Sequence, residues 1–151
     1  MRRLTMALGV MAAVLLVAGV SAQKNHNFTG TWTADADKNG PPPANGRGNA
    51  NSDFEIRMDD KTMNVITTRG AGNTTTNSYK LDGSESKNSG RGGDVITTAK
   101  WDGDKLVLTD KATSGTTAYW MDGTDLVREV TRPGANGAAG TPTRAFFKKK
   151  S

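Results

Sequence analysis

The chain has no cysteine and a single histidine among its 151 residues. Without cysteine it has no disulfide, no thiolate nucleophile and no zinc–cysteine site. The one histidine, His26, lies near the expected start of the mature protein, so no serine or threonine has a positioned general base. The sequence therefore indicates no catalytic residue. Two inward-facing carboxylates on different strands would leave no sequence pattern, so a glycosidase-like pair stays open.

The N-terminus has the three parts of a secretory signal peptide. Arg2 and Arg3 precede an uncharged run over 4–20, and the small residues Val20 and Ala22 fit a cleavage site before Gln23. The sequence predicts a signal peptide at 1–22 and a secreted or periplasmic protein with no membrane anchor after processing. The absence of cysteine excludes a lipid anchor on sulfur. The mature chain, 23–151, is expected to form one domain.

Helical spacing of apolar residues is missing after residue 23, whereas tight-turn signals recur. Three Asp-Gly pairs lie 20 residues apart, at Asp82-Gly83, Asp102-Gly103 and Asp122-Gly123. Asp-Gly favours a type I′ hairpin turn, and the flanking residues alternate between apolar and polar. This interval holds two strands and two turns, so all three pairs should lie at one end of a meander. The sequence predicts an all-β fold, an antiparallel up-and-down β-barrel of about 8–10 strands.

Ten segments have the alternation or composition of strands. They are Phe28–Ala34, Asp53–Met58, Thr62–Thr68, Thr75–Leu81, Ser84–Ser89, Asp94–Trp101, Asp104–Asp110, Thr116–Met121, Thr124–Thr131 and Thr143–Lys149. The entirely polar Ser84–Ser89 fits either a strand or a loop. A two-sheet sandwich would satisfy the same alternation, but sequential hairpins favour the barrel.

Longer, glycine-rich connections alternate with the tight turns and should gather at the opposite end of the barrel. Each carries a positive charge, and loops on a rigid scaffold commonly carry binding sites. The sequence predicts a basic rim that attracts a small polar or anionic ligand, formed by Arg47, Arg69, Arg91, Lys111 and Arg132.

The first predicted strand contains Gly30-Thr31-Trp32. A Gly-x-Trp at the start of an up-and-down barrel resembles the N-terminal signature of lipocalin-like (calycin-type) proteins. The chain as a whole resembles a small secreted bacterial β-barrel protein of that type. The resemblance implies that Trp32 closes one end of the barrel and that a cation from the last strands packs over its indole. Arg144 is the matching position by chain order.

Metal and nucleic-acid motifs are incomplete. Asp35, Asp37 and Asn39 match the opening of a calcium loop, but Gly46 stands where a bidentate glutamate is required. We therefore expect no metal and no cofactor, with those three residues as a weak alternative metal site. The Gly-Arg-Gly sequences at 46–48 and 90–92 are single copies, so no nucleic-acid partner is expected. The terminal lysines at 148–150 are interpreted as a solvated tail.

Two classes of function fit these observations. The first is an exported, non-catalytic binding module for a small molecule held in the barrel. The alternative is a structural or envelope-interaction protein whose barrel is filled by side chains such as Trp32, Phe54, Tyr79, Trp101 and Met121. The ligand and the oligomeric state are not specified by the sequence.

Overall fold

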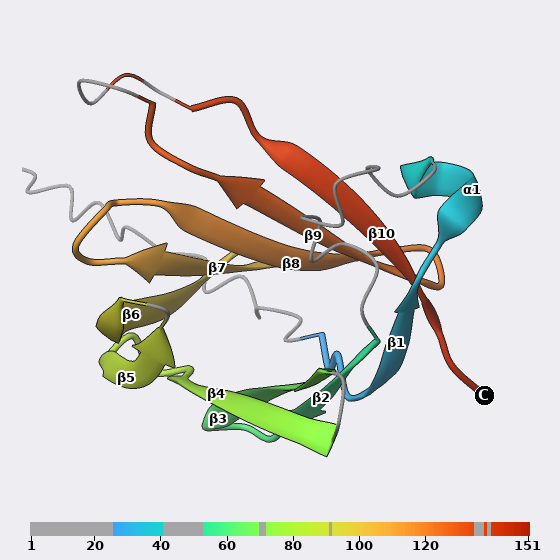
Figure 1. Ribbon diagram of the computed structural model, residues 1–151, viewed down its shortest axis with the longest axis horizontal. Coiled ribbons are helices and arrows are strands. Elements are labelled where there is room, and N and C mark those ends of the chain that lie inside the picture. Colours follow the sequence, from blue (N-terminus) through green and yellow to red (C-terminus); the bar gives the residue numbers. More distant parts are fainter. Residues whose placement is uncertain (1–25, 41–52, 70–71, 91, 135–137, 139) are drawn as a thin grey trace, which may run out of the picture.

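Figure 1 shows a computed structural model of the chain, which describes residues 26–40, 53–69, 72–90, 92–134, 138 and 140–151. The predicted signal peptide, Arg47 and Arg91 lie outside the described residues. Within that part of the chain, no helix is long and apolar enough to cross a membrane.

The described residues form ten strands and one short helix. They are β1 (Gly30–Ala34), α1 (Ala36–Asn39), β2 (Phe54–Met58), β3 (Thr62–Arg69), β4 (Asn73–Lys80), β5 (Glu85–Gly90), β6 (Gly93–Asp102), β7 (Lys105–Asp110), β8 (Thr116–Asp122), β9 (Asp125–Thr131) and β10 (Thr143–Lys149). Each strand matches a predicted one, and the polar segment at 84–89 is strand β5. The helix α1 was not predicted from the sequence.

The strands form one antiparallel sheet that curls into a nearly closed up-and-down barrel (Figure 1). Its order is β4-β3-β2-β1-β10-β9-β8-β7-β6-β5, so the first and last strands of the chain pair with each other. The predicted all-β barrel is confirmed, and a sandwich of two separate sheets is not what forms. The hydrogen-bonded ladder stops at β4 and β5, which are the two edges of the sheet.

The Asp-Gly turns lie where the sequence places them, but their geometry differs from the type I′ prediction. Asp102 pairs with Lys105, so the central residues of that turn are Gly103 and Asp104. Gly103 has a φ of 60°, whereas no aspartate has a positive φ among the described residues. A positive φ at the first central position alone is the pattern of a type II′ turn. The glycine therefore matters more than the aspartate here.

Large apolar side chains fill part of the barrel interior. Phe54 and Phe147 meet edge to face, with ring centroids 4.8 Å apart. Because alternate residues of a strand face opposite sides, a strand such as β2 contributes every second residue to this core, here Phe54 and Ile56. The largest fully buried side chains of this core are Phe28, Trp32, Ile56, Met63, Leu106, Leu126 and Phe147.

The C-terminal lysines are not a solvated tail. Lys148 Nζ lies 3.2 Å from Asp35 Oδ1, and Lys150 Nζ lies 2.8 Å from Asp53 Oδ2. Lys149 lies over the ring of Trp32. These contacts join the end of the chain to the segments on either side of α1. The sequence interpretation failed because it treated a run of charges as independent of the strand that carries it.

Candidate ligand-binding cavity

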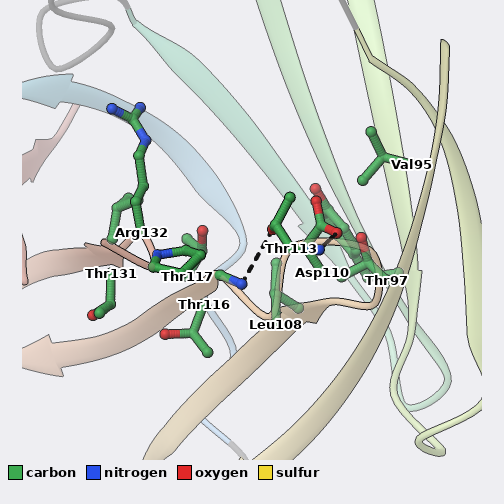
Figure 2. Close-up of a pocket in the computed structure, with 13 residues that line it drawn as sticks. Val95, Thr97, Leu108, Asp110, Thr113, Thr116, Thr117, Thr131 and Arg132 are labelled. Atoms are coloured by element: carbon green, nitrogen blue, oxygen red, sulfur yellow. Dashed lines mark hydrogen bonds between the residues drawn. The ribbon is translucent and has the colours of Figure 1, made fainter. Parts of the chain in front are cut away.

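A cavity of about 490 Å³ lies inside the barrel wall formed by β6–β9, with one contribution from β4 (Figure 2). This volume is in the range of small-molecule sites, about 300–1,000 Å³. Its lining mixes apolar side chains with hydroxyl groups and two charged residues. The lining residues are Tyr79, Val95, Thr97, Leu108, Asp110, Thr113, Gly115, Thr116, Thr117, Val130, Thr131, Arg132 and Pro133.

The β7–β8 connection forms an ordered edge of the cavity. Asp110 Oδ1 accepts hydrogen bonds from the main-chain N–H groups of Ala112 (2.8 Å) and Thr113 (3.0 Å). The N–H of Gly115 donates to Thr113 Oγ1 at 3.2 Å, as Figure 2 shows. The side chains of Asp110 and Thr113 are therefore fixed by the turn itself, and the opening is shaped before any ligand arrives.

Arg128 places a positive charge inside the barrel, next to the cavity. It is two residues from Val130 on the same face of β9, and Val130 lines the cavity. The Arg128 guanidinium carbon lies 4.9 Å from the centre of the Phe147 ring and 5.6 Å from that of Phe54. Both rings are buried, so this cation is held in apolar surroundings, where its electrostatic effect is stronger than in water.

Tyr119 is the partner of Arg128 in the β8–β9 register. Burial raises the pKa of the Tyr119 hydroxyl, while the charge of Arg128 and a hydrogen bond with it act in the opposite direction. The phenol therefore stays neutral at physiological pH. Together the two side chains offer a charged donor and a neutral hydroxyl to the interior.

Sequence reasoning missed Arg128, although the pattern contained a signal. Leu126, Arg128 and Val130 share one phase of the β9 alternation, and Leu126 and Val130 are apolar. A cation in the inward phase of an apolar strand is unusual, because burying a charge is costly. The ligand-binding prediction considered only charges in the connections and therefore overlooked Arg128.

The inner wall on the β4 side is also polar. Burial raises the pKa of Tyr79, and the nearby Tyr119 acts in the same direction, whereas a hydrogen bond with Asn77 opposes both. Asn77 Oδ1 is buried without a hydrogen-bond partner. This wall therefore also carries hydrogen-bonding groups that face the interior.

The predicted basic rim is only partly assembled in the described residues. Arg69, Lys111 and Arg132 each follow or end an odd-numbered strand, so the meander brings them to one rim of the barrel. Arg132 alone of these three lines the cavity, and in Figure 2 its side chain extends away from Asp110. Lys111 forms an ion pair with Glu85. Their role in ligand binding stays a prediction.

The predicted contact between Trp32 and Arg144 is wrong. Trp32 is 2% exposed, and its Nε1 donates to the carbonyl of Phe28 at 2.9 Å. The cation over its ring is Lys149, which is its register partner on β10. Arg144 precedes Lys149 by an odd number of residues and therefore lies on the outer face. There its guanidinium carbon is 5.7 Å from the Trp120 ring centre.

The three residues of the weak calcium alternative have structural partners. Asp35 caps α1 by accepting from the N–H of Asp37 at 3.0 Å. Asn39 donates to the carbonyl of Phe146 and accepts from its N–H, which extends the edge of β10. In the described segments, no group of three or more His, Asp or Glu side chains is arranged to hold a metal ion.

The barrel is similar to several solved structures. Zebrafish ileal bile acid-binding protein with cholic acid aligns over 82% of this chain and 98% of its own, with a TM-score of 0.63 and 22% identity. Echinococcus granulosus fatty-acid-binding protein 1 aligns over 82% of this chain and 98% of its own, with a TM-score of 0.59 and 14% identity. Secretory abundant heat soluble protein 4 from Ramazzottius varieornatus aligns over 82% of this chain and 94% of its own, with a TM-score of 0.55 and 21% identity.

No protein-family model matches the sequence, and the comparison with curated proteins gives no match either. At these identities the structural likeness shows the fold. The predicted up-and-down architecture is confirmed as a nearly closed barrel of ten antiparallel strands, whereas the resemblance to lipocalin-like proteins as a family stays a prediction.

Proposed function

We propose that this barrel binds an amphipathic small molecule that has an apolar body and an anionic head group. The observation that carries the proposal is Arg128, a cation inside the barrel beside a cavity of about 490 Å³. A guanidinium in apolar surroundings forms strong, often bidentate hydrogen bonds with a carboxylate. Tyr119 adds a neutral hydroxyl beside it. The apolar body would contact Val95, Leu108 and Val130.

The solved structures with this fold support the same class of ligand. One was determined with cholic acid, and another is called a fatty-acid-binding protein. Both kinds of ligand combine an apolar body with a carboxylate. The barrel of this chain offers the matching groups from its own residues, so the proposal does not depend on a shared binding motif.

A structural role is the second candidate, because a tightly packed cluster does fill part of the interior. Trp32, Phe54 and Phe147 are each at most 4% exposed. The cavity lies beside this cluster rather than in place of it. The two candidates therefore differ in one respect, namely whether the cavity takes up a molecule.

Native mass spectrometry of the purified protein distinguishes them. We expect an additional mass from a bound molecule, which organic extraction removes and which behaves as a weak acid. A spectrum with only the protein mass, both before extraction and after incubation with excess hexadecanoate, would support the structural role.

We also propose that the protein is exported and acts outside the cytoplasm. The support is the signal-peptide pattern of 1–22 with small residues at Val20 and Ala22. N-terminal sequencing of protein from the periplasm or the medium should give Gln23 as the first residue. Intact protein that begins at Met1 in the membrane fraction would contradict both the cleavage and the location.

A further inference from the structure

The barrel wall has one joint without a main-chain ladder, between β4 and β5, which we call the seam. Three hydrogen bonds cross it, and each uses a side chain. Asn88 Oδ1 accepts from the N–H of Ser78 at 2.7 Å, and Asn88 Nδ2 donates to the carbonyl of Ser78 at 3.0 Å. Ser86 Oγ accepts from the N–H of Lys80 at 2.8 Å. The Asn88 side-chain amide thus makes the two hydrogen bonds to Ser78 that a main-chain partner would make in a ladder.

Little apolar surface holds the seam together. Of the six residues in β5, Ser86 alone is buried, and none of the six is apolar. β4 is mostly exposed, with Asn77 and Tyr79 partly buried. Segments with few buried apolar contacts open at lower free energy than the laddered core of a sheet. The seam is therefore the joint of the wall that separates most easily.

The seam lies beside the cavity, whose lining includes a residue of β4 and residues of β6, the neighbour of β5, but none of β5 itself. Tyr79, between Ser78 and Lys80 on β4, lines the cavity. Val95 lines it too, and Val95 is the register partner of Asn88. Every other joint between neighbouring strands of the sheet carries a backbone ladder. A separation of β4 from β5 therefore widens this cavity directly, whereas widening at another joint would break main-chain pairs.

We propose that the seam is the adjustable wall of the cavity, and that Asn88 determines the largest ligand body the barrel accepts. The inference rests on the proposed function, since it concerns the size of the molecule bound in that cavity. Short ligands fit with the Asn88–Ser78 hydrogen bonds intact. Long ligands are accommodated when these bonds break and β4 moves away from β5.

A covalent cross-link tests this, because the chain contains no cysteine of its own. Ser78→Cys and Ser89→Cys place two exposed thiols on either side of the seam, to be joined by a short bismaleimide. Calorimetric titration should give an octanoate affinity within about twofold of the uncross-linked protein, and a hexadecanoate affinity lower by about tenfold or more. A matched control joins Thr68→Cys to Thr74→Cys, which are exposed register partners in the laddered β3–β4 joint, and should change neither affinity.

A second variant, Asn88→Ala, removes the two Asn88–Ser78 hydrogen bonds and needs no cross-link. The variant should raise the ratio of hexadecanoate to octanoate affinity by about threefold or more. In Asn88→Ala the seam can open without breaking the two Asn88–Ser78 hydrogen bonds, because they are already absent. Equal changes for both ligands in the cross-linked and Asn88→Ala proteins would overturn the seam proposal and leave the proposed function intact. Failure of the unmodified protein to bind either carboxylate would overturn the proposed function itself.

Discussion

Lys149 lies over the indole of Trp32, with its Nζ 6.0 Å from the ring centre, and Gly30 leaves the space for its alkyl chain. A methyl group on residue 30 would come within 2.6 Å of Lys149 Cε. Gly30 and Trp32 face the same side of β1, and Lys149 is the register partner of Trp32 on β10. These three residues therefore form one contact at the joint where the first and last strands meet.

A double-mutant cycle tests the contact between Trp32 and Lys149. Trp32→Ala should lower the free energy of unfolding by about 3–5 kcal/mol, because it empties a fully buried aromatic site. Lys149→Ala should lower it by about 0.5–2 kcal/mol through lost cation–π contact and packing. Residues in contact couple, so the double mutant should lose less than the sum. The control cycle combines Trp32→Ala with Arg144→Ala. In urea unfolding, the two losses of unfolding free energy should add in that double mutant.

Gly30→Ala should destabilise the barrel by about 1–3 kcal/mol, since it combines overpacking with an unfavourable backbone angle. The φ of Gly30 is 154°, which side-chain-bearing residues rarely adopt. A small part of the cost is the displacement of the flexible end of the Lys149 side chain, and that part should disappear when Gly30→Ala is made in a Lys149→Ala background. An identical loss of unfolding free energy in both backgrounds would show that Lys149 does not occupy this space.

The buried Asp35 makes stability sensitive to acid. Burial by itself raises the pKa of this carboxyl, but the hydrogen bond from Lys148 and the N–H of Asp37 outweigh it, so the net pKa lies below 3.8. A lowered pKa in the folded state stabilises the protein above the pKa of the unfolded chain. This contribution is lost as the pH falls through the folded-state pKa.

Urea midpoints measured from about pH 6 to pH 2 should therefore fall more steeply for the native protein than for Asp35→Asn. Lys148→Met should make the fall smaller, because it removes the partner that lowers the Asp35 pKa and so brings the folded-state pKa closer to that of the unfolded chain. Parallel curves for all three proteins would mean that Asp35 titrates alike in the folded and unfolded states.

The architecture could be predicted from the sequence because its signals are local. Glycine at 83, 103 and 123 fixes three turns, and alternation in segments such as Phe54–Met58 fixes which face is buried. The polar segment at 84–89 stayed open between strand and loop because its composition has no apolar alternation, and the structure shows that it forms β5.

The site could not be predicted in the same way, because it depends on register and on long-range pairing. Arg144 and Lys149 are both cations on β10, and only the pairing of Trp32 with Lys149 decides between them. Arg128 was overlooked because its partners, Phe54 and Phe147, come from other strands. The short helix α1 depends on Asp35 as its cap and on Asn39 binding Phe146, which no periodicity signals.

The most direct test of the proposed function is calorimetric titration of hexadecanoate into the native protein and into Arg128→Gln. The control is Arg144→Gln, which removes the same charge from the outer face, and Arg128→Lys tests for the charge alone if the glutamine variant does not fold. We expect one molecule bound per chain, an affinity lower by about tenfold or more in Arg128→Gln, and no change in Arg144→Gln. Absence of saturable binding to the native protein, or equal affinity in Arg128→Gln, would contradict the assignment of Arg128 as the anchor of an anionic head group.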